Sequence, residues 1–347
     1  LTLSGSLLGE SIASAVVIGA LVVMNLREVG MTKEQVCATI VMGCAMGSIM
    51  PPISQASTMA AGLVGLEGAA ADAVLNWTYL TIGITFVLVC LFTTTFFVKI
   101  KQLPEDLIPD KKAGQIIKEN WTSLVPLCFL ALVVIFRSGF HLDLLVLFKP
   151  IFDPISKIPI VKGLGYNITQ ILYLTIILSL FYKPVRSDFG GIVKEALGHV
   201  WPTVKIQLCA AFMIGAFYVG GQIDKTSAYL ATLSPGTLIV GGLLAMCLIG
   251  MLTGSQTTVQ STIFIMLGPA LIQTGISPVS AAIAGGHWAM AGQGMPPADT
   301  VTFATAGLID GIDESGEKVN LLQSMLYSCF MCACMIIAGL IFVLVIR

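Results

Sequence analysis

The chain has 347 residues, of which 56% are hydrophobic and 11% are charged, and its formal net charge at pH 7 is −1. A soluble domain carries about 25% charged residues, so this chain has too little charge to cover a water-exposed surface of its size. The composition therefore excludes a soluble enzyme, a nucleic-acid-binding protein and a disordered scaffold, and it predicts an all-α polytopic membrane protein.

The first segment, residues 1–66, opens with a short polar motif, Ser4-Gly5-Ser6, which is followed by an apolar stretch over 7–24. We interpret the motif as the tip of a re-entrant helical hairpin and the apolar stretch as its returning arm. The chain starts at Leu1 rather than at Met, and we expect the outgoing arm of the hairpin to precede this residue.

The next apolar stretch, residues 34–66, is interrupted by Gly47 and by the pair Pro51-Pro52. Proline lacks a backbone N–H and clashes with the preceding helical turn, so two prolines near a glycine favour a local opening of the helix. Unwound backbone inside a bilayer is tolerated where it is buried in protein or lines a cavity. The alternative is a simple kink, which membrane helices commonly contain.

Residues 67–235 are predicted to form connecting and scaffold helices, and 312–347 a C-terminal membrane helix. A membrane span needs about 20 mostly apolar residues. The complete spans predicted on this basis are 76–98, 121–137, 166–182, 203–220 and 321–346. The loops 99–120 and 183–200 are rich in Lys and Arg, which favours the cytoplasmic side for both.

The segment 236–311 repeats the order of the first segment. Two apolar arms, 236–252 and 256–272, flank the polar motif Thr253-Gly254-Ser255, which predicts a second hairpin. The apolar stretch 278–311 is then interrupted by two glycines and a second proline pair. We therefore expect a second broken helix here.

The two copies align without a gap from Gly30 to Val64, whereas the first copy is four residues longer between its tip motif and the glycine turn. If both basic loops are cytoplasmic, the second copy enters the membrane from the side opposite to the first. The sequence therefore predicts an inverted repeat with broken helices, which is typical of secondary transporters.

The hairpin tips and helix breaks supply the polar groups of a candidate site. Backbone carbonyls and small hydroxyls can replace the water around a hard cation, whereas free N–H groups at a helix start suit an anion. The predicted helix-breaking residues are Pro51, Pro52, Pro296 and Pro297. The candidate ion ligands are Ser4, Gly5, Ser6, Gly47 and Ser48 for one cation, and Thr253, Gly254, Ser255, Gly292 and Gly294 for a second. The candidate substrate-binding residues are Ser54, Gln55, Thr58, Asp299, Thr300 and Thr302. The alternative for each single hydroxyl is a hydrogen bond to its own helix.

Two ionisable residues fall inside predicted membrane segments. A carboxylate in the membrane is costly, so Asp299 indicates a functional site. An Asp at this place can equally cap the second half-helix, and the two roles are compatible. We interpret His287 as a hydrogen-bonded core residue rather than a proton carrier.

These motifs resemble the large permease subunit of the TRAP (tripartite ATP-independent periplasmic) transporters, within the ion transporter superfamily. The resemblance rests on Ser4-Gly5-Ser6 followed by Gly47-Ser48-Ile49-Met50-Pro51-Pro52, and on the second copy of both elements. It covers nearly the whole chain and implies an elevator-type symporter of the inner membrane that imports an organic acid, such as a C4-dicarboxylate. It further implies sodium as the coupling ion, no organic cofactor, a small membrane subunit (separate or fused) and a periplasmic substrate-binding protein. Asp299 departs from the expected pattern, which leaves the coupling ion and the substrate class open.

The same residues are compatible with other functions. A binding-protein-independent carboxylate symporter or a sodium/proton antiporter of the same superfamily would share the hairpins, and Asp299 would suit the antiporter because proton exchange needs a titratable group. An intramembrane enzyme would need a Ser/His pair, paired Asp residues or a zinc motif, and the sequence shows none of these arrangements. We therefore expect a transporter and not an enzyme.

Overall fold

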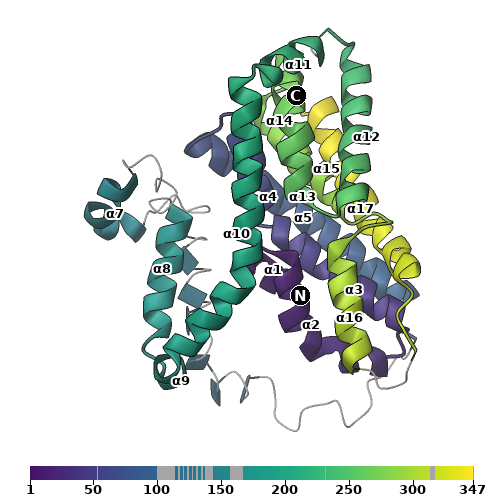
Figure 1. Ribbon diagram of the computed structural model, residues 1–347. Coiled ribbons are helices and arrows are strands. Elements are labelled where there is room, and N and C mark those ends of the chain that lie inside the picture. Colours follow the sequence, from purple (N-terminus) through teal and green to yellow (C-terminus); the bar gives the residue numbers. More distant parts are fainter. Residues whose placement is uncertain are drawn as a thin grey trace. The chain divides into compact units, whose positions relative to one another are not determined.

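The computed structural model describes residues 1–52, 54–99, 144–156, 167–230, 232–312 and 317–346, together with short helical pieces between 114 and 136. Within these residues all regular structure is helical, as the composition predicts. The chain divides into two compact units, one formed by Leu1–Leu107 with Ala210–Arg347 and the other by Ile108–Cys209. All predicted tip and break residues lie in the first unit, whose helices are labelled in Figure 1.

The second unit contains only part of the predicted scaffold among its described residues. Its elements are the 3-10 helix η2 (Leu144–Phe148), α7 (Lys149–Ser156), α8 (Asn167–Ser179), α9 (Lys183–Ser187) and the first part of α10 (Phe189–Val219). Helix α8 matches the predicted span 166–182. The predicted span 121–137 and the loop 99–120 lie largely outside the described residues. The connection 183–200, whose alternating polar and apolar positions predict a helix along the cytoplasmic interface, is mostly helical. It consists of α9 and the start of α10, and α10 then continues through the predicted span 203–220.

The first unit begins with a helical hairpin. Helix α1 (Thr2–Leu8) ends at Gly9, whose φ of 67° lies in the left-handed region, and α2 (Ser11–Glu28) starts after Glu10. Residues with a side chain rarely adopt this backbone conformation, so glycine suits the turn. The Glu10 carboxylate accepts a hydrogen bond from the Ala13 N–H at 2.5 Å and thereby caps α2.

The predicted break at Pro51-Pro52 separates two helices. Helix α3 (Lys33–Ile49) starts with a reciprocal capping box between Thr32 and Gln35. It stops before the proline pair, and α4 (Gln55–Leu63) resumes after it. The prediction of a break rather than a kink is therefore confirmed.

The second copy has the same order of elements. Its hairpin contains α12 (Pro235–Thr253), α13 (Gln256–Val259), the π-helical turn η4 (Gln260–Phe264) and α14 (Ile265–Gln273). Its broken helix consists of α15 (Pro278–Gln293) and α16 (Thr300–Ile312). Gly254 ends α12 with a φ of 60°, as Gly9 ends α1. The short helix α11 (Gln222–Leu230) precedes this copy.

Two long helices, α5 (Ala69–Phe96) and α17 (Leu321–Leu344), follow the two copies and pack against each other. Phe92 stacks on Phe330 with ring centroids 4.4 Å apart, and Trp77 meets the edge of Phe342 at 5.4 Å. Because the residue numbers of these two pairs change in opposite senses, α5 and α17 are antiparallel.

Helices α3 and α15 run in opposite directions along α17. The Asn320 N–H at the start of α17 donates to Glu34 Oε1 in the first turn of α3, at 3.3 Å. At the other end of α17, the Ser280 hydroxyl in the first turn of α15 donates to the Ile346 carbonyl at 3.5 Å. Helix α3 therefore starts where α17 starts, and α15 starts where α17 ends.

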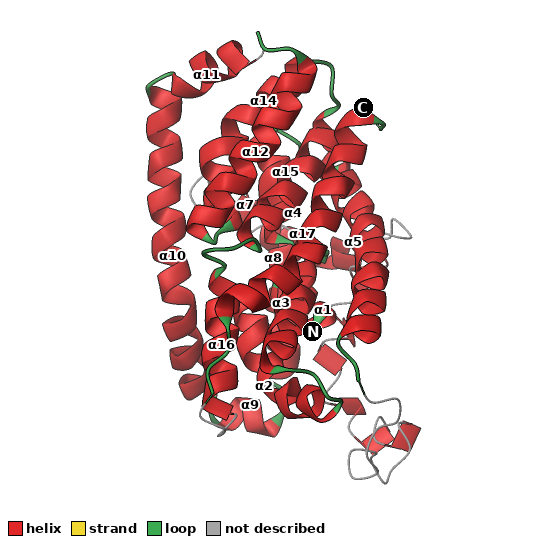
Figure 2. Cartoon of the chain, turned by 90° about the vertical axis from the view of Figure 1, so that its right-hand side faces the viewer, coloured by secondary structure: helices red, strands yellow, loops and turns green. Residues whose placement is uncertain are grey.

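The second half of each broken helix packs against helices of the other copy. Helix α16 packs against α2 and α3, whereas α4 packs against α15. Figures 1 and 2 show α16 beside α2 and α3, and α4 beside α15. The Gln260 amide donates from Nε2 to the Ala56 carbonyl of α4 at 3.0 Å, which links α4 to the second hairpin. The two copies are thus interlocked at their breaks.

Among the described residues, four helices are long and apolar enough to cross a membrane: α2, α5, α12 and α17. Many of their large apolar side chains are exposed, for example Leu80 at 53% and Leu244 at 63%. Such surfaces are stable in contact with lipid and not in contact with water. The chain is therefore a helical, multi-pass membrane protein.

Candidate functional site

The structure moves the tip of the first hairpin by a few residues. Ser4-Gly5-Ser6 lies inside α1, and the turn is formed by Gly9 and Glu10. The predictions of a tip at Ser4-Gly5-Ser6 and of an outgoing arm entirely before Leu1 were therefore wrong. Glycine adopts the left-handed conformation at residue 9, whereas Gly5 is helical, so the Ser-Gly-Ser motif does not mark the turn.

The corrected tip also removes the predicted four-residue gap. Gly9 lies 245 positions before Gly254, and Gly47 lies 245 positions before Gly292. The same register therefore relates both hairpin tips and both helix breaks.

Each hairpin crosses its own broken helix at a pair of glycines. A Cβ atom on Gly5 would lie 2.8 Å from Gly47 Cα, and a Cβ on Gly250 would lie 2.5 Å from Gly292 Cα. Distances this short are not tolerated between atoms that are not bonded, so these backbones approach closely only because side chains are absent. The two pairs occupy equivalent positions of the two copies. They hold each hairpin arm against the end of the helix that precedes the break.

Four side chains cap the helices that leave the tips and the breaks. Glu10 caps α2 and Ser255 caps α13, where its hydroxyl accepts from the Thr258 N–H at 3.3 Å. At the breaks, the Ser54 hydroxyl accepts from the Ser57 N–H at 3.1 Å, and Asp299 caps α16. In the first copy the carboxylate cap is at the tip and the hydroxyl cap is at the break. In the second copy the hydroxyl cap is at the tip and the carboxylate cap is at the break.

Asp299 is fully buried, and both of its carboxylate oxygens accept hydrogen bonds from the first residues of α16. Its Oδ1 accepts from the Val301 N–H at 3.1 Å, and its Oδ2 accepts from the Thr302 N–H at 3.2 Å and from the Thr302 hydroxyl. The predicted capping role of Asp299 is therefore confirmed. Hydrogen bonds and the positive end of a helix stabilise the ionised form of a carboxyl group, whereas complete burial stabilises its neutral form.

Gln293, which is not among the predicted site residues, joins the two hairpins. Its Oε1 accepts from the Gln256 N–H at 3.0 Å, and its Nε2 donates to the Ser11 hydroxyl at 3.4 Å. Ser11 and Gln256 are the first residues of the two returning arms and are equivalent in the register of the repeat. The signal available in the sequence was the position of Gln293 between the predicted ligands Gly292 and Gly294.

Two further amides of the second hairpin have unsatisfied acceptors. Among the described residues, the buried atoms Gln256 Oε1 and Gln260 Oε1 have no hydrogen-bond partner. The Gln260 orientation is fixed because its Nε2 donates to Ala56. A buried acceptor without a donor is costly, so the returning arm beside the second tip offers two oxygens for an external donor or a cation.

The predicted ligands and contacts divide into two groups. Ser6 and Thr300 link separate elements, because the Ser6 hydroxyl donates to the Pro51 carbonyl at 2.8 Å and the Thr300 hydroxyl donates to the Gly254 carbonyl at 2.8 Å. The hydroxyls of Ser48 and Thr253 donate to carbonyls of their own helices, which is the alternative stated for single hydroxyls. The Ser4 hydroxyl makes both kinds of contact, since it bonds to the nearby Leu1 carbonyl and to the Ser14 hydroxyl of the returning arm.

The remaining substrate candidates lie on the two second half-helices. Gln55 is half-buried and Thr58 is exposed on α4, whereas Thr302 is buried on α16. Gly294 ends α15 next to Cys332 of α17, where an added Cβ would lie 2.9 Å from the sulfur atom. The candidate ion ligands of the second copy therefore lie around the second tip and the second break. Gln293 connects this region to the returning arm of the first hairpin.

His287 is a buried, hydrogen-bonded residue, as we interpreted it. Its Nδ1 lies 2.8 Å from the Ile283 carbonyl, and its Nε2 lies 2.8 Å from the Thr81 hydroxyl. A carbonyl can only accept, so Nδ1 carries the proton and Nε2 is free to accept from Thr81. The ring thus links α15 to α5.

The comparisons with known proteins identify the family. A search of curated proteins finds no match. The family model described as "Tripartite ATP-independent periplasmic transporter, DctM component" matches residues 1–346. The chain therefore belongs to the DctM family, the large membrane component of TRAP transporters, and it is a transporter component and not an enzyme.

Proposed function

We propose that the chain is the permease of a sodium-driven importer of an organic acid in the inner membrane. Its partners would be a small membrane subunit, separate or fused, and a periplasmic protein that delivers the substrate. The observation that carries this proposal is that Gln293, at the second helix break, is hydrogen-bonded to the returning arms of both hairpins just after their tips. Membership of the DctM family supports the transport of organic acids.

An inverted repeat accounts for the geometry of the site. Helices α3 and α15 run in opposite directions, and the two copies share one register. Transporters built this way bind substrate and ions where the copies meet. We propose that the two hairpins and two broken helices form a transport domain that moves as an elevator against a scaffold. In this proposal each hairpin is re-entrant and its tip ends inside the membrane, although the arms α2 and α12 are long and apolar enough to span it.

Two sodium ions would bind at the two tips. Carbonyl oxygens released at a helix break are hard ligands that suit sodium. We propose the break residues Gly47 and Ser48, with the neighbouring first tip, for one ion. The second ion would use Thr253, Gly254, Ser255, Gly292 and Gly294. The first site then depends on Glu10 and Ser6 rather than on a tip at Ser4-Gly5-Ser6.

The substrate carboxylate would bind at the start of α4. Both second half-helices present positive dipole ends near the breaks. The Asp299 carboxylate already neutralises the start of α16, whereas the cap of α4 is the uncharged Ser54. We therefore propose Ser54, Gln55 and Thr58 as contacts of the substrate carboxylate. Thr300 and Thr302 would contact other parts of the substrate.

The alternative is a sodium/proton antiporter or a binding-protein-independent symporter of the same superfamily. The buried carboxylate of Asp299 is the feature that suits proton exchange. Its three donors stabilise the ionised form, whereas its complete burial stabilises the protonated form, so the pH dependence of uptake separates this alternative from sodium coupling.

A thermal-unfolding titration of the full-length protein with sodium tests the ion sites. A ligand that binds only the folded state stabilises it by about 2.7 kcal/mol at a hundred times its Kd. We expect saturable stabilisation by sodium and not by potassium or choline, weakened by Ser6→Ala and by Ser255→Ala. The control is Ser179→Ala, whose hydroxyl bonds only to Ile176 of its own helix among the described contacts. Equal stabilisation by the three cations would contradict the proposal.

A further inference from the structure

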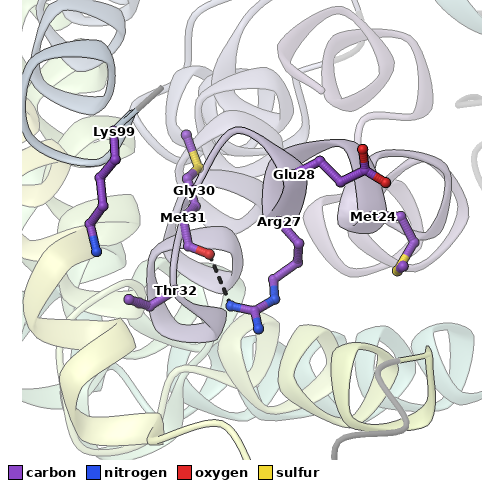
Figure 3. A pocket seen from close by; sticks show the side chains of 7 residues that line it. All are labelled: Met24, Arg27, Glu28, Gly30, Met31, Thr32 and Lys99. Atoms are coloured by element: carbon purple, nitrogen blue, oxygen red, sulfur yellow. Dashed lines mark hydrogen bonds between the residues drawn. The ribbon is translucent and has the colours of Figure 1, made fainter. Parts of the chain in front are cut away.

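The larger of the two described cavities lies away from the tips, where α2 and α5 end, and it has a volume of about 530 Å³. Figure 3 shows its lining, in which the Arg27 guanidinium donates to the Met31 carbonyl at 2.9 Å. The arginine of this cavity therefore already serves the turn that follows α2. Two buried acceptors for which the described residues supply no donor lie instead on the second hairpin, at Gln256 and Gln260.

Gln260 is completely buried and lies against the first turn of α4. Its Nε2 donates to the Ala56 carbonyl at 3.0 Å. Since Nε2 and Oε1 belong to one planar amide, Oε1 lies beside the same turn, and none of the described groups donates to it. Gln260 is also the first residue of the π-helical turn η4, a rare element that is frequent at functional sites. The amide oxygen is thus held beside α4 with its acceptor capacity unused.

The first turn of α4 also has an unused donor. In the register of the repeat, Ala56 of α4 lies 245 positions before Val301 of α16. The Val301 N–H donates to Asp299 Oδ1 at 3.1 Å. The Ser54 hydroxyl accepts from the Ser57 N–H, and the Ala56 N–H has no partner within the described part of the chain. A substrate carboxylate at the start of α4 would therefore take the place that the Asp299 carboxylate takes at α16.

Gln260 has no counterpart in the first copy. It lies 245 positions after Ala15, which belongs to the uninterrupted helix α2. The two proposed ions bind at equivalent tips, so their ligands should be repeated, whereas a single substrate molecule can use a residue that only one copy has. A cation is also disfavoured beside Gln260 Oε1, because the positive end of α4 lies next to it. Both features favour a neutral donor from the substrate over sodium.

We propose that the substrate is a hydroxylated organic acid, with its carboxylate at the start of α4 and one of its hydroxyl groups donating to Gln260 Oε1. The hydroxyl contact depends on the proposed position of the carboxylate. A site that bonds a substrate hydroxyl rejects the analogue without it, because the buried group of the protein then stays unsatisfied. Ionised keto acids and unsubstituted dicarboxylates are acceptors only. The substrate class therefore narrows from organic acids in general to hydroxy acids and sugar acids.

The test compares three acids with analogues that lack their hydroxyl groups: lactate with propionate, malate with succinate, and gluconate with hexanoate. Dissociation constants are obtained from thermal unfolding of the full-length protein in saturating sodium. We expect at least one hydroxylated acid to bind about fivefold to a hundredfold more tightly than its analogue, because the analogue leaves a buried acceptor unsatisfied.

Two substitutions assign this preference to Gln260. Gln260→Met has a similar length but only a weak acceptor, so the ratio of the two dissociation constants should fall to about one. Gln260→Glu keeps an acceptor oxygen and should keep the preference, although its charge weakens the binding of both acids. Gln273→Met, at an exposed residue of α14, is the matched control and should behave like the unchanged protein. The comparison in the unchanged protein keeps the proposal falsifiable if Gln260→Met does not fold.

Three results would overturn the hydroxyl contact and leave the proposed function intact. Equal binding of both members of every pair would show that no hydroxyl is recognised. A preference that survives in Gln260→Met would assign the hydroxyl to another residue. Weaker stabilisation by sodium in Gln260→Met, with an unchanged preference, would assign Oε1 to an ion. If sodium stabilises the protein and none of the six acids does, the substrate part of the proposed function fails, and the hydroxyl contact fails with it.

Discussion

Gly5 of the first hairpin and Gly47 of the first broken helix lie in backbone contact, and Gly250 and Gly292 repeat this contact in the second copy. In each case the absence of a side chain allows the arm of a hairpin to rest on the last turn before a break. The contact fixes the position of each hairpin tip relative to its break. The repeat in the sequence therefore corresponds to the same local geometry in both copies.

The first prediction concerns this contact. Gly47→Ala would place a Cβ 2.6 Å from Gly5 Cα, and overpacking of this kind costs about 1–3 kcal/mol of unfolding free energy. The control is Gly62→Ala in α4, where nothing lies within 4 Å of an added Cβ. We expect a clearly lower unfolding temperature for Gly47→Ala alone.

The second copy offers the same comparison. Gly292→Ala should destabilise like Gly47→Ala, since its Cβ would lie 3.1 Å from Gly250 Cα and nearer still to the Met246 carbonyl, at 2.9 Å. Gly307→Ala, the counterpart of the Gly62 control, again meets nothing within 4 Å. Equal unfolding temperatures for Gly292→Ala and Gly307→Ala would refute the close crossing.

Another prediction concerns the link between the hairpins. Gln293→Leu leaves the buried Gln256 N–H and the Ser11 hydroxyl without their partner, and each unsatisfied buried group costs about 1–3 kcal/mol. We expect lower stability and weaker stabilisation by sodium in thermal unfolding. Gln273→Leu, at an exposed residue of α14, should change neither. A Gln293→Leu protein with unchanged sodium stabilisation would show that the bridge does not support the ion sites.

A further prediction separates the two roles of Asp299. Asn is as good an N-cap as Asp, whereas Ala costs about 0.5–2 kcal/mol. Asp299→Asn should therefore keep most of the unfolding free energy of the unchanged protein, whereas Asp299→Ala should lower it. The pH dependence of sodium-driven uptake should be the same for Asp299→Asn as for the unchanged protein. Loss of that pH dependence in Asp299→Asn would assign proton exchange to this carboxylate.

The last substitution tests the substrate position. Ser54→Asp would put a carboxylate at the start of α4 and make it resemble α16. Repulsion of a like charge at a helix start is worth about 1 kcal/mol or more, so we expect a KM for the organic acid about fivefold higher or more. Ser54→Asn, an uncharged cap, should leave the KM close to that of the unchanged protein. Equal KM values for both variants would place the carboxylate elsewhere.

The sequence predicted the breaks better than the tips. A proline pair cannot remain inside a regular helix, so Pro51-Pro52 and Pro296-Pro297 located both breaks. A Ser-Gly-Ser motif has no such constraint, because helical and left-handed glycines look alike in a sequence. Had the gapless register been extended back from Gly30, it would have aligned Gly9 with Gly254 and located the first tip.

Long-range contacts explain what else could not be predicted. The bridge of Gln293 depends on two residues that lie 37 and 282 positions away, and no local pattern indicates such partners. The exchange of the half-helices α4 and α16 is likewise a property of packing and not of the segments themselves. The capping role of Asp299 was predictable because capping is a local rule of helix starts.

Uptake into proteoliposomes measures sodium-driven import of an organic acid. The large subunit is reconstituted with its small subunit, the periplasmic binding protein is added outside with labelled organic acid, and an inward gradient of sodium, potassium or protons is imposed. We expect accumulation only with the sodium gradient and only with the binding protein present. Accumulation driven equally well by a proton gradient in sodium-free buffer, or uptake that does not need the binding protein, would contradict it.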